Sequence, residues 1–405
     1  MDDAQAALAA LMNSPAWTMA TASLSAGHER MVADIVTLTE IPSPPFGEET
    51  RAAAYLEMLR AHGLEDVERD AGGNVMGLRR GAGNGGLLVV AAHLDTVFPA
   101  GTDVTVRREG TKLFAPGIGD DTRGLAVLLA FIRALDAAAI RTRDDILFVG
   151  DVGEEGLGDL RGMRHLFGEG KYRERIKTFI TVDSPEMESI AIGGIGSKRL
   201  RVFFRGPGGH SFGAHGIVNP MYAMAHAMLA LSRTEVPARP RTTYAATVAG
   251  GGTSINAIPN EVWMDVDLRS QSAEELARLE RHFRGLVDEA VAAENRARRT
   301  ANGAIAAELR LLGDRPAGAT AADHPLVRGA SAAIAAHGFT PRHEYSSTDA
   351  NIAMSLGIPA IKIGSGGSGG RAHSLEEWID VEPKASLRGM AAGLAALVGA
   401  AGYIE

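Results

Sequence analysis

The stretch "VVAAHLDTVFP" (residues 89–99) decides how this chain folds and where its chemistry lies. It begins with an apolar run, which is typical of a β-strand buried on both faces. The run ends in His93, and Asp95 follows two residues later. A buried strand that stops at an imidazole and a carboxylate indicates that polar side chains gather at one edge of a sheet.

Similar apolar runs recur along the first half of the chain. They predict strands at 87–93, 145–152 and 178–183, and a helical pattern at 124–137 separates the first two. Apolar strands separated by helices are typical of a sheet covered by helices on both faces. We therefore expect an α/β catalytic domain with a mixed sheet flanked by helices.

The pattern changes near residue 195. The strands expected at 198–205 and 261–269 alternate apolar and polar residues, which is typical of a sheet with one face in water. Asn219 followed by Pro220 predicts the start of a helix between them. These elements form a smaller α+β insert.

The expected domain boundaries follow from this change of pattern. Residues 1–196 and 315–405 are predicted to form the catalytic domain, and residues 197–314 the insert. The apolar strand expected at 358–364 returns the chain to the α/β pattern.

Composition excludes several classes of function. The 405 residues carry a formal net charge of -8, so the chain has no electrostatic footprint for nucleic acid. Cysteine is absent, so a metal could be bound only by His, Asp and Glu. The first residues lack the basic start of a secretory signal, and no apolar run is long enough to cross a bilayer. We expect a cytoplasmic protein with no membrane partner.

Polar residues follow several of the predicted strands. A lone His or Asp at a strand end is more often a cap or a turn residue than a ligand. Repetition of the same placement favours a site, because ligands of open α/β sheets bind at the carboxyl ends of the strands. Imidazoles and carboxylates suit Zn²⁺ or a similar divalent ion. The candidates are His93, Asp95, Asp120, Asp121, Glu154, Glu155, Asp183 and His373.

The paired acids indicate a division of roles. Glu154 and Glu155 project to opposite faces if the chain is extended, so one can bind metal while the other acts as a base. Asp95 can bind the second ring nitrogen of His93 and fix its tautomer.

Five short segments resemble, in order, the signature segments of a family of co-catalytic zinc metallopeptidases. That family includes peptidase T, aminoacylase, carnosinase-type dipeptidases and succinyl-diaminopimelate desuccinylase. The resemblance spans nearly the whole chain, including the insert. The segments are "HLDTV" (93–97), "PGIGDD" (116–121), "GEEG" (153–156), "VD" (182–183) and "AHS" (372–374).

The resemblance implies two divalent metal ions, Zn²⁺ in the first place and Co²⁺ or Mn²⁺ as alternatives. His93, Asp120 and Asp183 would bind one ion. Asp120, Glu155 and His373 would bind the other, so that Asp120 bridges the two.

The resemblance also implies roles for residues that do not bind metal. Glu154 would be the general base, and Asp95 would orient His93. The insert resembles the family's lid and dimerisation domain, in which His210 would reach the partner's active site in a homodimer. Asn256 would bind substrate, and Arg269 would bind its carboxylate.

The same resemblance narrows the reaction without fixing it. Deacylase branches usually carry Glu where this chain has Asp183, and peptidase T and dipeptidase branches carry Asp. We therefore predict a dipeptidase or a di/tripeptide aminopeptidase, with an N-acyl-amino-acid deacylase as the alternative. A non-catalytic binding protein is disfavoured, because Glu154 is not needed to hold metal. One departure, "DDTRGLA" where many relatives have Lys and two glycines after the bridging acid, has no interpretation from the sequence.

Overall fold

The computed structural model describes residues 3–83 and 85–405. It divides into two compact units. Unit 1 runs to Gly194 and resumes at Ala319, and unit 2 is Ile195–Gly318. The insert expected at 197–314 lies within unit 2.

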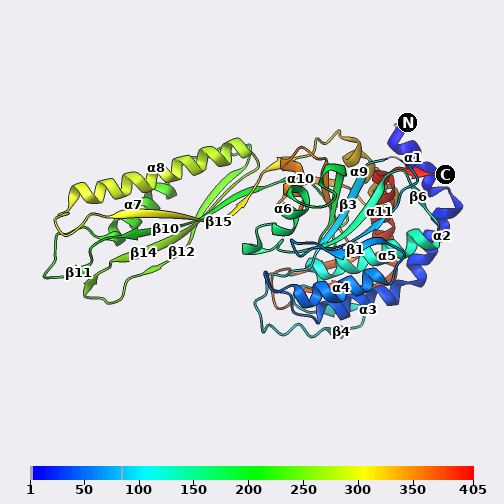
Figure 1. Cartoon of the computed structure of the whole chain (residues 1–405), viewed down its shortest axis with the longest axis horizontal. Helices are drawn as coiled ribbons and strands as arrows, with labels where there is room; N and C mark the ends of the chain where they lie inside the picture. Colours follow the sequence, from blue (N-terminus) through cyan, green and yellow to red (C-terminus); the bar gives the residue numbers. More distant parts are fainter. Residues whose placement is uncertain (1–2, 84) are drawn as a thin grey trace. The chain divides into compact units, whose positions relative to one another are not determined.

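Unit 1 is built on a nine-stranded mixed sheet (Figure 1). The strands beside β3 run parallel to it, and the sheet becomes antiparallel further out. In spatial order the strands are β1 (Glu65–Arg69), β2 (Val75–Arg79), β7 (Asp145–Asp151), β3 (Leu87–His93), β8 (Ile176–Val182), β18 (Ala360–Ile363), β9 (Ser189–Gly194) and β16 (Gly318–Ala319), with β17 (Arg342–Ser346) paired to β9.

Strand β3 shows why this sheet forms a core on both faces. All seven of its residues are buried. Leu88 and Val90 belong to one apolar cluster, whereas Val89 and Ala91 belong to another. Because successive side chains point to opposite faces of a strand, each face of β3 needs its own cover. The continuous apolar run in the sequence is the signature of this arrangement, and the predicted α/β class is confirmed.

Helices cover the two faces of the sheet unequally. The larger apolar cluster packs beneath α1 (Asp3–Met12), α2 (Pro15–Ala26), α3 (His28–Thr39), α4 (Glu49–Arg60), α5 (Arg123–Ala137), α9 (Pro325–Ala336) and α11 (Pro383–Ala401). The smaller cluster packs beneath α6 (Arg161–Gly168) and α10 (Ala350–Ser355).

Two features of unit 1 position its polar residues. Strands β7, β3, β8 and β18 are parallel neighbours, so their carboxyl ends meet at one edge of the sheet. A small sheet lies beside this edge, made of β4 (Arg107–Glu109), β5 (Lys112–Phe114), β19 (Ser368–Gly370) and β20 (Trp378–Asp380). A separate two-stranded sheet in unit 1 joins β6 (Arg141–Thr142) to β21 (Tyr403–Ile404).

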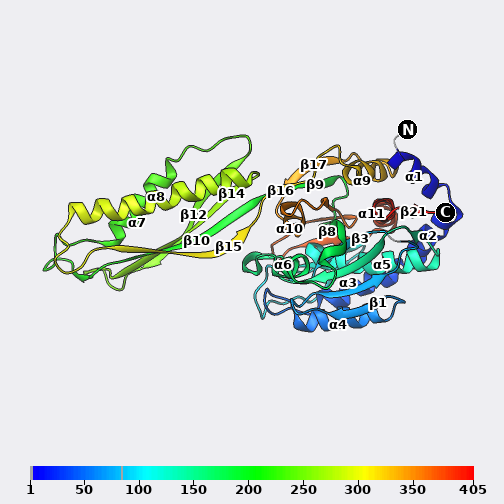
Figure 2. The same cartoon turned by 45° about the horizontal axis from the view of Figure 1, so that its top comes forward.

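Unit 2 has a four-stranded antiparallel sheet with two helices on one face (Figure 2). Every second residue of β14 is buried against the helices, as its alternating sequence predicts. The elements are β10 (Gly196–Arg205), α7 (Pro220–Ser232), β12 (Thr242–Gly251), β14 (Glu261–Ser270), α8 (Ala273–Ala297) and β15 (Ala306–Arg315), and β11 (Gly209–His210) pairs with β13 (Ala257–Ile258).

The helix starts of unit 2 follow the sequence signals. The Asn219 side chain accepts a hydrogen bond from the Met221 N–H at 2.9 Å, and Ser272 accepts one from the Glu275 N–H at 3.3 Å. Each side chain caps a backbone donor that the first helical turn leaves without a partner.

Across residues 3–83 and 85–405, we find no helix with the length and apolar character needed to span a lipid bilayer.

Candidate metal centre

The carboxyl edge of the unit 1 sheet gathers side chains from five separate segments. His93 ends β3, and Asp183 follows β8 directly. Glu155 lies in the loop after β7, Asp120 in the loop before α5, and His373 between β19 and β20. All five predicted metal ligands therefore lie in unit 1.

Asp120 lies between the two imidazoles. Its Oδ1 is 2.9 Å from His93 Nε2, and its Oδ2 is 3.0 Å from His373 Nε2. One carboxylate thus presents one oxygen to each histidine, which is the arrangement of a ligand shared by two cations.

Further acids complete two groups around Asp120. His373 Nε2 also lies 3.0 Å from Glu155 Oε1. Among the described residues, three groups have ligand atoms within 4.8 Å of one another. Two of them contain Asp120: one is His93, Asp120 and Asp183, and the other is Asp120, Glu155 and His373. The third consists of His93, Glu154 and Glu155. The two groups that share Asp120 are the two sets that the sequence resemblance implied.

Burial and like charges perturb the acids of this centre. Desolvation, assisted by the charge of Asp120, raises the pKa of Asp183 to about 6. Desolvation opposes ionisation of Asp120 as well, but hydrogen bonds from His373 and His93 outweigh it and hold the Asp120 pKa well below its usual range. Hydrogen bonds to Asp120 and Glu155 raise the pKa of His373 to about 10.

The donor set suits a pair of divalent cations. The centre concentrates several carboxylates where burial penalises their negative charge, and cations remove that penalty. Ligands of one Zn²⁺ ion at 2.0–2.2 Å lie no more than about 4.4 Å apart, close to the spacing of both groups. Imidazole nitrogen and carboxylate oxygen are ordinary zinc ligands.

Asp95 lies in this centre but contacts different atoms than expected. His93 Nδ1 is 2.9 Å from the main-chain oxygen of Asp95 and 3.8 Å from its carboxylate Oδ1. The fully buried carboxylate instead accepts hydrogen bonds from the N–H groups of Glu154 and Glu155, at 3.0 and 2.8 Å. Asp95 therefore fixes the loop that carries both glutamates, and its carbonyl fixes the ring of His93.

Glu377, which the sequence patterns do not single out, fixes the 117–120 loop that carries Asp120. The residue is 2% exposed, and its carboxylate accepts hydrogen bonds from the N–H groups of Gly117, Gly119 and Asp120, at 2.9, 2.7 and 2.9 Å. Pairing of β20 with β5 brings Glu377 to this loop. Burial raises its pKa to about 7 despite these bonds. Its position just after the "AHS" segment was the available signal.

The departure at "DDTRGLA" has a structural basis. The Arg123 side chain is buried and donates to Ser386 Oγ of α11 at 2.6 Å. It thereby ties the start of α5 to a second helix. A Cβ at Gly124 would lie 2.3 Å from Asp121 Oδ1, so this position requires glycine. Asp121 in turn accepts the His93 N–H at 3.2 Å.

Two of the predicted lid residues, His210 and Asn256, lie together in unit 2. Residues Gly209 and His210 pair with Ile258 and Ala257, and the Ser211 N–H donates to the Asn256 carbonyl at 2.9 Å. His210 is exposed, and its Nδ1 accepts the N–H groups of Phe212 and Gly213, both at 3.2 Å. Its proton therefore resides on Nε2 in the neutral ring.

Arg269, the third predicted residue of unit 2, lies on β14. Its Nε donates to Asp267 Oδ2 at 2.7 Å, and the side chain borders a cavity of about 180 Å³.

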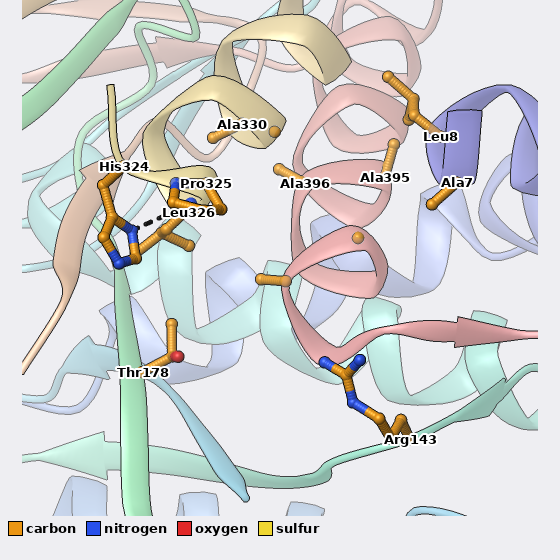
Figure 3. A pocket seen from close by; sticks show the side chains of 13 residues that line it. Ala7, Leu8, Arg143, Thr178, His324, Pro325, Leu326, Ala330, Ala395 and Ala396 are labelled. Carbon is orange, nitrogen blue, oxygen red and sulfur yellow. Dashed lines mark hydrogen bonds between the residues drawn. The ribbon is translucent and has the colours of Figure 1, made fainter. Parts of the chain in front are cut away.

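A separate cavity of about 210 Å³ lies in unit 1 (Figure 3). Small side chains of α9 and α11 line it together with Arg143, His324 and Thr178. Thr178 is near the start of β8, whereas Asp183 follows its end, and a rise of about 3.3 Å per residue separates them by about 16 Å. This cavity is therefore not part of the metal centre.

The fold and the site together define a class. An α/β domain that gathers two imidazoles and several carboxylates around one shared aspartate is typical of metal-dependent hydrolases. The chain belongs to Peptidase family M20/M25/M40, whose family model matches residues 89–400. Both the resemblance noted in the sequence and the assignment as an enzyme are confirmed.

Individual relatives are more distant. Carboxypeptidase G2 from Pseudomonas sp. (strain RS-16) is 26% identical over 201 residues, which are 49% of this chain and 48% of that protein. The chain therefore matches about half the length of this curated relative.

Two solved structures are similar in fold. Aminopeptidase PepT from Bacillus cereus ATCC 10987 has a TM-score of 0.73 at 22% identity, covering 92% of this chain and 98% of that one. The YXEP protein of Bacillus subtilis, described as a dinuclear metal binding peptidase, has a TM-score of 0.67 at 18% identity, with coverage of 92% and 98%.

Proposed function

We propose that this chain binds two Zn²⁺ ions and hydrolyses an amide bond in a small substrate with a free carboxylate, as a dipeptidase or a di/tripeptide aminopeptidase. The position of Asp120 carries the proposal, since its two oxygens lie 2.9 and 3.0 Å from the Nε2 atoms of His93 and His373. The dinuclear metal binding described for the similar Bacillus subtilis peptidase supports the same number of ions.

The residues divide between holding the cations and moving a proton. His93, Asp120 and Asp183 would hold one ion, and Asp120, Glu155 and His373 the other. When bound, the cations supply Lewis acidity to the scissile carbonyl and acidify the attacking water.

Glu154 moves the proton in this proposal. Its carboxylate takes a proton from the attacking water and delivers it to the leaving nitrogen. Asp95 sets the position of Glu154 relative to Glu155, because the two oxygens of one carboxylate bind the N–H groups of both residues.

Three residues of unit 2 complete the proposal. Arg269 binds the free carboxylate of the substrate, and Asn256 makes a further substrate contact. His210 of one protomer donates a hydrogen bond from its Nε2–H to the oxyanion in its partner's active site, as the family resemblance implies.

Exposed apolar surface on unit 2 supports the homodimer. Met221, Tyr222 and Leu229 of α7 are 38%, 53% and 50% exposed. The neighbouring sheet ends in the edge strand β12, which pairs with β14 on one side and with no strand of the described residues on the other, and Val248 on it is 50% exposed. Unpaired edges and exposed apolar residues favour association with a second chain.

A substrate panel tests the reaction. The purified protein, supplied with Zn²⁺, Co²⁺ or Mn²⁺, is assayed with free-amine dipeptides and tripeptides and with N-acetyl and N-succinyl amino acids. We expect hydrolysis of the free-amine peptides. Hydrolysis of the blocked compounds alone would replace the peptidase with a deacylase, and hydrolysis of none would refute the proposed function.

A further inference from the structure

A second arginine borders the same cavity as Arg269. This cavity of about 180 Å³ in unit 2 is lined by Ile195, Arg241, Thr243, Arg269 and Gln271. Thr243 and Arg269 are directly opposed on β12 and β14, and the Gln271 N–H donates to the Arg241 carbonyl at 3.1 Å. Arg241 directly precedes β12 and Gln271 directly follows β14, so the four side chains lie together at this end of the two strands and border one cavity.

The polar atoms that line the cavity are mainly hydrogen-bond donors. Gln271 Oε1 accepts the Arg241 N–H at 2.9 Å, which leaves the amide NH₂ to donate elsewhere. Within the described ranges, the Arg241 guanidinium makes no hydrogen bond or ion pair. None of the five lining residues is acidic. A concave site with this chemistry recognises an anion.

The rest of this sheet face is charged but balanced. Arg201 forms two hydrogen bonds with Asp265, at 2.7 and 2.8 Å. Arg205 donates to Glu261 at 2.6 Å and also pairs with Glu308. Arg241 differs from these arginines because no carboxylate neutralises it, so unbalanced positive charge faces the cavity.

We infer that Arg241 selects substrates that carry a second carboxylate, namely those with Asp or Glu on the carboxyl side of the scissile amide. The inference rests on the proposed function, in which Arg269 binds the main-chain carboxylate. Arg241 directly precedes β12, and extending the register Thr242↔Ser270 by one residue places it diagonally across from Arg269, at a Cα spacing of about 7 Å. Two long arginine side chains at this spacing can each bind one carboxylate of the same acidic residue.

The test compares substrates that differ only in the second carboxylate. kcat/KM is measured for Ala-Glu against Ala-Gln, and for N-acetyl-Glu against N-acetyl-Gln, so that a peptidase and a deacylase are both covered. We expect the wild type to prefer the acidic member by about 10- to 100-fold, the value of a charged hydrogen-bonded pair.

Variants assign the preference to Arg241. Arg241→Gln should lower kcat/KM for the acidic substrate to that of the amide and leave the amide substrate unchanged. Arg241→Lys should keep part of the preference, because it keeps the charge but loses the planar fork. Arg281→Gln, an exposed position on α8 with the same loss of charge, is the matched control and should leave both substrates unchanged.

Each outcome decides the inference. Equal rates for the acidic and amide substrates, or a preference that survives in Arg241→Gln, would refute the inference while the proposed function stands. If neither series is hydrolysed, the substrate panel separates the two claims: hydrolysis of other free-amine peptides refutes the inference and leaves the proposed function standing, whereas hydrolysis of none refutes both.

Discussion

The metal centre of unit 1 and the polar residues of unit 2 are held in opposite ways. In unit 1, His93 and Asp95 are 1% and 0% exposed, and buried carboxylates bind the backbone of the ligand loops. In unit 2, His210 and Asn256 are exposed. Apart from the exposed His373, the candidate centre is buried or half-buried and is fixed by its own domain, whereas the exposed residues of unit 2 act through what they bind.

This difference gives an order of expected effects. Changes in unit 1 should alter chemistry and metal binding most strongly. Changes in unit 2 should act on substrate and transition-state contacts and leave the metal content intact.

The largest effect on turnover is expected at the base. Glu154→Gln removes the proton acceptor but keeps the shape of the side chain, so kcat should fall about 100- to 10,000-fold. Elemental analysis of the same sample should show unchanged metal content, because the proposal gives Glu154 no part in holding the ions. Wild-type turnover in this variant would show that another group is the base.

His210→Ala is expected to lower kcat by about 100-fold, the usual cost of one oxyanion donor. Light scattering should show the same dimer as the wild type, and the metal content should not change. Full activity in a dimeric variant would show that His210 does not act on the oxyanion.

Glu377→Gln should weaken metal binding by about 10- to 100-fold, as is usual for residues that orient ligands. Gln has an NH₂ donor in place of one carboxylate oxygen, so at least one of the three N–H groups of the 117–120 loop loses its acceptor and faces another donor. Affinity is measured by calorimetric titration of the metal-free protein with Zn²⁺. Glu376→Gln, an exposed neighbour with a 63% exposed side chain, is the control and should bind as the wild type does. Equal Zn²⁺ affinities in both variants would show that Glu377 does not position the metal ligands.

The smallest expected effects are on the free energy of unfolding, and they compare how tightly one glycine is packed in each unit. Gly124→Ala places a Cβ 2.3 Å from Asp121 Oδ1 and should destabilise unit 1 by about 1–3 kcal/mol. Gly285→Ala on the exposed side of α8 meets nothing within 4 Å and should stabilise unit 2 by about 0.5–1 kcal/mol. Urea unfolding measures both, and a stabilised Gly124→Ala would contradict the tight packing of the centre.

The sequence predicts the parts of this molecule that depend on strand pattern. Continuous apolar runs fix β3, β7 and β8, and parallel pairing then brings the residues after them to one edge. The proposed ligands His93, Glu155 and Asp183 are predictable for this reason, whereas Asp120 and His373 do not follow a strand of this sheet and come from the resemblance alone. The resemblance to known segments adds their division between two ions.

Other parts depend on contacts that no local pattern encodes. Arginine is usually exposed, yet the side chain of Arg51 in α4 is buried and donates to the carbonyl groups of Leu94 and Ile41 at 2.9 and 2.7 Å. Glu377 is one of two adjacent glutamates, and only the pairing of β20 with β5 distinguishes it from Glu376. Such residues become visible once distant segments are placed side by side.

Metal content tests the central claim most directly. Wild-type protein and Asp120→Asn are loaded with Zn²⁺, dialysed, and measured by elemental analysis. If Asp120 is shared by two cations, the wild type should retain two ions per chain and Asp120→Asn fewer than one. A wild type without bound metal, or an Asp120→Asn variant that still holds two ions, would contradict it.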